Sequence, residues 1–129
     1  MKILFLGDVH GITTWEAIVD HALRHLVDKI VFVGDYLDSR VITNGVDIYD
    51  NLKSIIELKK RYPDKITLLL GNHDYNYMMG HGISGFDPVM FHDYHDLLKA
   101  NWDLFDLAWG AWKDGKYWLV SHAGLRKEY

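Results

Sequence analysis

The chain has 129 residues, of which 49% are hydrophobic and 25% are charged, and its formal net charge is −4. These values are typical of one soluble globular domain and give no signal for nucleic-acid binding. The sequence contains no cysteine, which excludes disulfides, thiolate nucleophiles and cysteine-type zinc sites, so any metal must be held by Asp, His or Asn.

The N-terminal half alternates apolar runs of strand type with helical repeats. Strands are expected at residues 2–6, 30–33 and 66–70, where Ile, Leu and Val predominate. Thr13 and Glu16 fit a capping box that opens the first helix. The residues expected on one face of this helix are Trp15, Ile18, Val19, Ala22 and Leu26.

A second helix is expected from about Asp47 until Pro63 closes it. Its predicted inner face comprises Ile48, Leu52, Ile55 and Ile56. The order strand-helix-strand-helix-strand implies an α/β fold with a parallel sheet.

The pattern changes after the third strand. Residues 75–87 are expected to be weakly structured, and Asp87 and Pro88 then fit an N-cap and the first position of a third helix. The predicted buried stripe of that helix is Met90, Tyr94, Leu97 and Leu98. Asp114-Gly115 predicts a tight hairpin turn between strands at 104–112 and 116–120.

Polar residues that can bind metal or phosphate follow the expected strands directly. The four endings are Gly7–Gly11, Gly34–Asp38, Gly71–Asp74 and Ser121–Gly124. In open α/β sheets, ligands bind at the carboxyl ends of the strands. We therefore expect these residues to meet at one edge of a sheet.

The first two endings contain pairs of candidate ligands. In an extended chain, the side chains of Asp8 and His10 would point the same way and both could reach one ion; the alternative is a helix-capping Asp and a surface His. Asp35 could bridge two cations with its two oxygens, or it could belong to a turn. Asp38 is expected to support a metal-bound histidine, rather than to end a helix.

The third and fourth endings add four more functional groups. The amide oxygen of Asn72 suits a hard or borderline cation, His73 is then available to donate a proton or contact phosphate, and Asp74 could orient its ring. The alternative for this triplet is a polar turn. His122 alone would be read as structural, but four suitable strand ends together favour a shared metal site.

Other candidates are weaker. Arg40 could form a fork for phosphate or be an ordinary exposed loop arginine, and His81 lies in a Gly-rich loop that could line a substrate cleft. Two histidine pairs, His21 with His25 and His92 with His95, are interpreted as solvated helix faces. Tyr36, Tyr75 and Tyr77 could flank a substrate or cover the core.

The four endings resemble the signature blocks of the calcineurin-like metallophosphoesterases, closest in type to their bacterial and phage serine/threonine phosphatase-like members. The matching blocks are Asp8-Val9-His10, Gly34-Asp35-Tyr36-Leu37-Asp38, Gly71-Asn72-His73-Asp74 and His122-Ala123-Gly124. The resemblance extends over essentially the whole chain. It implies a metallophosphoesterase-type αββα sandwich, in which two sheets are flanked by helices.

The resemblance also implies metal-dependent hydrolysis of phosphoric esters. Two adjacent divalent ions, about 3.5–4 Å apart, would activate water for attack on phosphorus. Mn, Fe or Zn would suit these ligands, and Mn is the ion to add in vitro. The implied metal ligands are Asp8, His10, Asp35, Asn72 and His122. The implied catalytic residues are His73, Asp74 and Asp38, and the substrate-binding residues are Arg40, Asn72 and His73.

One family block is absent. A Gly-His-x-His or Gly-His-Thr block would be expected after His122, but only five residues follow Gly124. We therefore expect residues 1–129 to form a single domain that corresponds to the N-terminal portion of the family fold, a parallel βαβαβ sheet plus a helix and a hairpin, with the second sheet incomplete. A truncated chain, a split or short gene product, and a dimer whose partner covers the open face remain alternatives.

The leading hypothesis is therefore a metal-dependent phosphatase or phosphodiesterase. The alternative is a catalytically weak or inactive fragment of the same family that acts through binding or assembly. A nucleotide-binding module without hydrolysis lacks support, because no glycine-rich phosphate loop follows the first strand.

The expected partners follow from the same reasoning. They are a phosphate-ester substrate, no membrane, and a second copy of the chain covering the incomplete sheet. Because the N-terminus is read as a strand rather than a signal peptide, we expect a cytoplasmic protein.

Overall fold

A computed structural model describes residues 1–124. Its main sheet has four parallel strands in the order β1-β2-β3-β4. These strands are β1 (Ile3–Leu6), β2 (Lys29–Phe32), β3 (Ile66–Leu69) and β4 (Phe105–Asp106). A separate antiparallel sheet consists of the hairpin β5 (Ala108–Lys113) and β6 (Lys116–Ser121). The structure thus confirms the predicted α/β class and the parallel arrangement of the first three strands.

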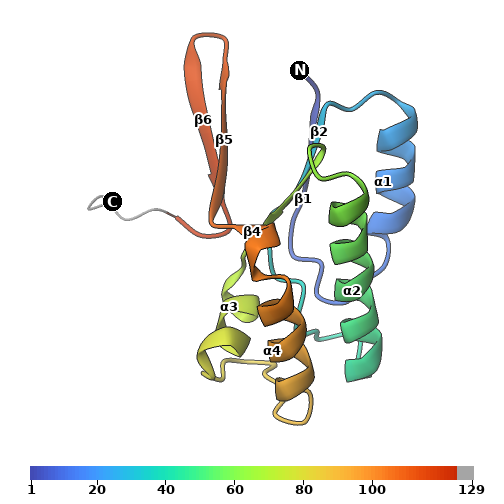
Figure 1. The fold of residues 1–129 in the computed structure, drawn as a ribbon, viewed down its shortest axis with the longest axis vertical. Helices are drawn as coiled ribbons and strands as arrows, with labels where there is room; N and C mark the ends of the chain where they lie inside the picture. The colour runs from blue at the N-terminus through green and yellow to red at the C-terminus, as the bar shows by residue number, and fades with distance from the viewer. Residues whose placement is uncertain (125–129) are drawn as a thin grey trace.

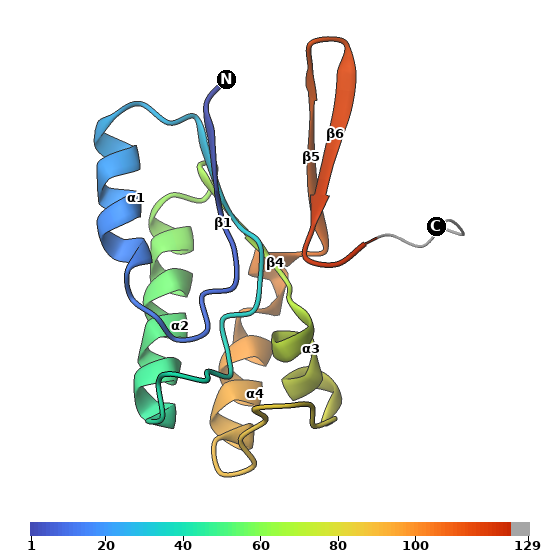
Figure 2. The same ribbon diagram turned by 180° about the vertical axis from the view of Figure 1, so that it is seen from behind.

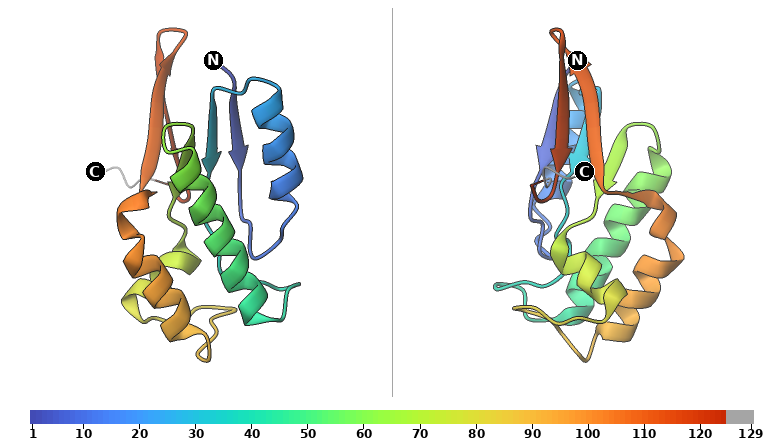
Figure 3. Two further views of the ribbon diagram at one scale, coloured as in Figure 1. Left: turned by 45° about the vertical axis from the view of Figure 1, so that its right-hand side comes forward. Right: turned by 90° about the vertical axis from the view of Figure 1, so that its left-hand side faces the viewer.

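Within residues 1–124, four α-helices accompany the main sheet. They are α1 (Trp15–Arg24), α2 (Gly45–Arg61), α3 (Asn72–Met79) and α4 (Phe91–Ala100), and a short 3₁₀ turn at Trp102–Leu104 leads into β4. Helices α1 and α2 lie on one side of the sheet and the hairpin stands on the other (Figures 1 and 2). Helices α3 and α4 pack against each other near the carboxyl ends of the strands (Figure 3).

The core lies between the sheet and the helices. Every residue of β3 is buried, and so are Ile30, Val31 and Phe32 of β2, as expected for central parallel strands. From α2 the predicted residues Ile48, Leu52, Ile55 and Ile56 are all buried. From α1 only Trp15, Val19 and Ala22 are buried, whereas Ile18 and Leu26 of the predicted stripe are exposed.

The hairpin forms the second layer. Asp114 and Gly115 have φ angles of 51° and 73°, the positive pair that a tight type I′ turn requires, so the predicted turn is confirmed. The edge of Trp109 packs against Phe5 of β1, with ring centroids 6.1 Å apart. Trp112 and Trp118 remain 71% and 57% exposed. Among the described residues the second sheet has two strands, which are the predicted hairpin.

Three helix starts differ from the predictions. Helix α1 is preceded by Thr14, and no side chain caps it, so the capping box of Thr13 is wrong. Helix α2 begins earlier than Asp47, because the Asn44 side chain accepts the Val46 N–H at 2.9 Å. Helix α4 begins after Met90, because Asp87 closes a turn of its own before the helix.

Two elements were not predicted. Helix α3 extends into the stretch predicted to be weakly structured, and its C-terminal residue is followed by Gly80 in the left-handed conformation (φ 75°). The predicted strand at 104–112 is divided at Leu107, which is 77% exposed. Its first part joins the parallel sheet as β4 and its second part forms β5. Within residues 1–124 no helix is long and apolar enough to span a bilayer.

Candidate functional site

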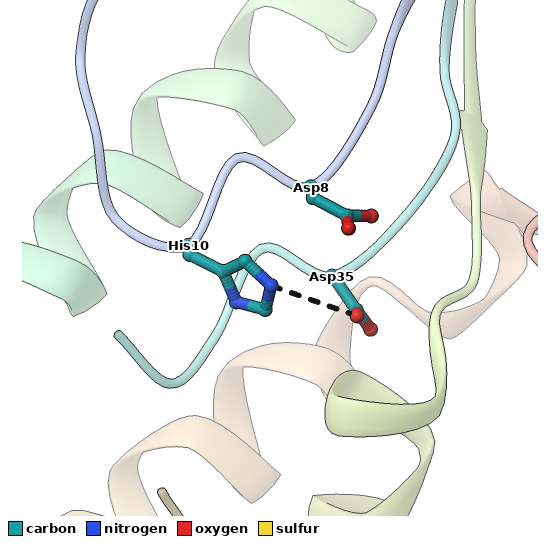
Figure 4. A group of neighbouring side chains, drawn as sticks. All are labelled: Asp8, His10 and Asp35. Atoms are coloured by element: carbon teal, nitrogen blue, oxygen red, sulfur yellow. Dashed lines mark ion pairs between the residues drawn. The ribbon is translucent and has the colours of Figure 1, made fainter. Parts of the chain in front are cut away.

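The loops that follow β1, β2, β3 and β6 meet at the carboxyl edge of the sheet. One ligand atom from each of Asp8, His10 and Asp35 lies within 4.8 Å of the others, and the three side chains approach one another in Figure 4. His122 joins them from the end of β6: its Nε2 lies 3.2 Å from Asp35 Oδ2 and 2.9 Å from Asn72 Oδ1. All five predicted metal ligands are therefore neighbours, with the Asp35 carboxylate between the two histidines.

Backbone carbonyls orient both imidazole rings. His10 Nδ1 lies 2.7 Å from the Asp38 carbonyl oxygen, and His122 Nδ1 lies 2.9 Å from that of Val33. Because a carbonyl oxygen only accepts, each Nδ1 carries the hydrogen and each Nε2 presents its lone pair to the carboxylate of Asp35. Such an outer hydrogen bond is the usual support of a metal-binding histidine.

The resulting donor set fits divalent cations. His122 Nε2, Asn72 Oδ1 and Asp35 Oδ2 are all electron-pair donors when the ring is neutral, so their close approach is repulsive unless a positive charge lies between them. Two ligands bound at about 2.1 Å to one ion, at right angles, are roughly 3 Å apart. The separations of 2.9 and 3.2 Å agree with that spacing.

The loops that carry the candidate ligands after β1 and β2 (residues 7–11 and 34–38), here called the ligand loops, contain several residues with positive φ angles. Asp8, His10, Asp35 and Asp38 have φ angles of 45°, 43°, 58° and 59°. Asp and His tolerate this left-handed region better than most residues do. Because β1 ends at Leu6, the expectation that Asp8 and His10 share one side of an extended chain is wrong. They approach Asp35 through two successive bends, which the His10 N–H secures by donating to the Asp35 carbonyl oxygen at 2.8 Å.

Two glycines allow the loops after β2 and β3 to approach each other. A Cβ added at Gly71 would lie 2.1 Å from Asp35 Oδ1, and one added at Gly34 would lie 2.5 Å from the Gly71 nitrogen. No side chain fits at either position. The close approach lets the His73 N–H donate to Asp35 Oδ1 at 3.0 Å, which orients the carboxylate from its other side.

Asp74 has a different place from the one predicted. Its carboxylate is fully buried and accepts N–H groups from Asp35, Tyr36, Leu37 and Gly71 at 2.8–3.1 Å. Burial raises the pKa of Asp74 to about 6, while the amide donors oppose this shift. Both oxygens are thus committed to the two loops, so the expectation that Asp74 orients the ring of His73 is wrong.

Asp38 takes that position instead. Its Oδ2 lies 2.8 Å from His73 Nδ1, and its Oδ1 accepts the hydroxyl of Tyr77. Burial raises the pKa of Asp38, and the hydrogen bonds from Tyr77 and His73 oppose the rise. The pairing agrees with the expected support of a histidine by Asp38. Sequence reasoning missed the link from Tyr77, because the four-residue spacing from His73 becomes meaningful only once α3 is known to be helical.

A cleft of about 410 Å³ adjoins the site. Asp8, His10, His73, Arg40 and Ser84 are among the residues that line it. Two predicted substrate residues, Arg40 and His73, therefore face the same space, whereas Asn72 lies toward His122. The remaining candidates lie elsewhere. The ring centroids of His21 and His25 are 4.1 Å apart at the C-terminal end of α1. His95 Nδ1 lies 2.9 Å from the Tyr77 carbonyl oxygen, and Tyr36 is buried in the core.

Comparison with known sequences assigns the family. The family model of the calcineurin-like phosphoesterases matches residues 1–128. The chain belongs to this family. This assignment agrees with the resemblance seen in the motifs of this calcineurin-like phosphoesterase.

Individual relatives support the family assignment. The chain is 35% identical over 103 residues to the serine/threonine-protein phosphatase sitA of Aspergillus fumigatus, covering 78% of the chain and 24% of the relative. It is 29% identical to the PP2A-like phosphatase PPG1 of Candida albicans, covering 95% of the chain and 29% of the relative. The chain thus spans about a quarter of the length of these curated relatives.

Solved structures support the fold. Yfce, a phosphoesterase from E. coli, superposes with a TM-score of 0.55 at 14% identity, covering 95% of this chain and 58% of the other. At this identity the likeness concerns the fold of our calcineurin-like phosphoesterase alone.

Proposed function

We propose that this chain hydrolyses phosphate esters with divalent metal ions held at the carboxyl edge of its main sheet. The observation that carries the proposal is the approach of His10, His122 and Asn72 to the single carboxylate of Asp35. With neutral rings, each of these groups can present a lone pair to a cation, and together they form a ligand set of oxygen and nitrogen atoms. Family membership supports phosphoric esters as the substrate class.

Two ions would be held around Asp35. One would use Asp8 and His10, the other Asn72 and His122, and Asp35 would serve both. When bound, such ions lower the pKa of coordinated water and stabilise charge on phosphoryl oxygens. Mn, Fe and Zn all suit these oxygen and nitrogen ligands, and Mn is the first ion to test.

The chain's own residues would position the ester and move a proton. His73 faces the cleft beside His10, their ring centroids 5.2 Å apart. With its Nδ1–H held by Asp38, His73 turns its Nε2 toward the cleft, and in the imidazolium form this nitrogen would donate its proton to the leaving oxygen or to a phosphate oxygen. Arg40, which lines the same cleft, would bind the phosphate through its guanidinium fork. Asp74 would act by holding the loops, without touching substrate.

The proposal is tested by turnover of p-nitrophenyl phosphate and of its bis ester with added Mn²⁺. We expect hydrolysis of at least one ester by the wild-type chain and loss of most of it in Asp35→Asn, because both ions share this carboxylate. Asp96→Asn, an exposed carboxylate on α4 far from the ligand loops in sequence, is the matched control and should keep full activity.

Metal content per chain, measured by elemental analysis of protein purified without chelator, separates the two hypotheses. Bound metal with no turnover of either ester would favour a non-catalytic role in binding or assembly. Self-association and a cytoplasmic location both stay predictions from the sequence.

A further inference from the structure

Tyr77 is buried in an aromatic cluster, and its hydroxyl is the polar group at one end of the ring. Its ring stacks on Phe86 with centroids 4.6 Å apart and meets the edge of Tyr94 at 5.0 Å. The hydroxyl oxygen accepts the backbone N–H of Asp87 at 2.7 Å. Because the oxygen receives this hydrogen, its own hydrogen is directed to Asp38, whose Oδ1 it contacts.

The carboxylate of Asp38 has little freedom left. It is 4% exposed, and its Oδ2 is occupied by His73 Nδ1. A Cβ added at Gly85 would lie 3.2 Å from Asp38 Cβ, so the loop between α3 and α4 packs directly on this side chain. Gly85 has a φ of 88°, which favours glycine and permits the contact. Tyr77 is therefore the group that satisfies Oδ1.

We propose that Tyr77 is a positioning residue for His73, acting through Asp38, and that the Asp87 N–H fixes the phenol in turn. The Tyr77 hydroxyl donates a hydrogen bond to Asp38 Oδ1, and this fixes the carboxylate so that its Oδ2 faces His73 Nδ1. This oxygen keeps a hydrogen on His73 Nδ1, so that the neutral ring is the Nδ1–H tautomer and Nε2, which faces the cleft, is the nitrogen that takes up and gives away the catalytic proton. Burial raises the pKa of Tyr77 well above its ordinary value, so the phenol stays a donor at every pH at which the protein is assayed.

Removing the Tyr77 hydroxyl leaves one oxygen of the Asp38 carboxylate without its hydrogen-bond donor. In Tyr77→Phe the ring still fills its place in the aromatic cluster, but Oδ1 of Asp38, a side chain that is only 4% exposed, loses its donor. The carboxylate then rotates or takes up a proton, and Oδ2 no longer holds the His73 ring. The consequence for catalysis rests on the proposed function, whereas the tautomer of His73 does not.

Tyr94→Phe is a matched control. Tyr94 is equally buried in the same cluster, and its hydroxyl donates to the Gly45 carbonyl oxygen at 2.9 Å without touching Asp38. Each variant therefore loses one buried hydroxyl, and we expect both to show a similar fall in melting temperature. A purely structural role for Tyr77 predicts that the two variants also behave alike in every other measurement.

The kinetic arm compares both variants on p-nitrophenyl phosphate with Mn²⁺. For Tyr77→Phe we expect kcat to fall about tenfold with KM unchanged, the usual scale for an outer hydrogen-bond partner, and Tyr94→Phe should keep the wild-type kcat. In a His73→Asn background, Tyr77→Phe should cause no further loss. Equal losses in the two tyrosine variants, or a full additional loss without His73, would overturn the proposal.

The second experiment does not depend on catalytic activity. Histidine rings labelled with ¹⁵N report their tautomer through long-range proton–nitrogen correlations, and the His73 signals are assigned by their absence in His73→Asn. In metal-free protein we expect His73 to carry hydrogen on Nδ1 in wild type and Tyr94→Phe, and to shift toward Nε2–H in Tyr77→Phe. An unchanged tautomer in Tyr77→Phe would refute the proposal. An inactive wild-type chain would refute the proposed function alone, because the tautomer still decides the role of Tyr77.

Discussion

Asp74 connects the loops after β2 and β3, and Asp74→Asn tests how much the fold depends on that connection. The substitution keeps the size of the side chain and replaces one acceptor oxygen by an NH₂ group. In the wild type, Oδ1 accepts from Tyr36 and Leu37, and Oδ2 accepts from Gly71 and Asp35. Whichever oxygen is replaced, two buried N–H groups face a donor.

The expected loss follows from those two orphaned donors. A buried polar group without a partner costs about 1–3 kcal/mol, so two of them lower the free energy of unfolding by roughly 2–6 kcal/mol. Because small domains are stable by only about 5–15 kcal/mol, the variant should be severely destabilised. The ligand loops should lose their geometry as well, since Asp35 itself is one of the residues held.

Equilibrium unfolding in urea, followed by tryptophan fluorescence, measures this loss. Asp96→Asn is the control, and an exposed substitution of this kind should change stability by less than about 0.5 kcal/mol. Hydrogen exchange on the wild type adds an independent check, because the amides of Asp35, Tyr36, Leu37 and Gly71 should be strongly protected. A loss below about 1 kcal/mol, or rapid exchange at those amides, would refute the reasoning.

Three further predictions concern the same edge of the sheet. Gly71→Ala should lower both the melting temperature and the metal content, because the added methyl would overlap Asp35; Gly7→Ala, whose methyl meets nothing within 4 Å, should change neither. His73→Ala should leave metal content nearly intact by elemental analysis while kcat falls, and loss of both metals would show that its assigned role is wrong. Chelation with EDTA should lower the melting temperature, since an ion at 100 times its Kd stabilises the fold by about 2.7 kcal/mol; an unchanged melting curve would argue against a preformed site.

Local patterns predicted the frame of the molecule well. The apolar runs at β2 and β3 and the stripe on α2 are buried as expected, because long periodic segments leave few alternatives. Asp114-Gly115 identified its hairpin because few residue pairs tolerate two positive φ angles. The grouping of Asp8, His10, Asp35 and Asn72 at one edge followed from the rule that parallel strands end together. His122 reaches the same edge from β6 of the antiparallel hairpin, which that rule does not cover.

Local sequence patterns could not predict which residues of distant segments contact one another. Whether Asp38 or Asp74 holds His73 depends on how the loop after β2 lies against α3, and the adjacency of Asp74 in sequence favoured the wrong partner. Likewise, β4 is a strand only because Phe105 pairs with Leu68 across the sheet. The bends at Asp8 and His10 are invisible to a strand-periodicity argument, since both residues have normal side chains for an extended segment.

The left-handed backbone of the ligand loops bears on how relatives of this chain should be read. At Asp8, Asp35 and Asp38 the conformation restricts the residue type independently of any chemistry, because branched and bulky side chains are strained there. Relatives that have lost catalytic activity could replace the charged side chains, but they would still need residues that tolerate the left-handed backbone at these positions. At these positions we expect such relatives to carry asparagine or glycine rather than valine or leucine. An aspartate that is retained there is therefore weaker evidence of catalytic activity than a retained His122, whose backbone does not have a positive φ.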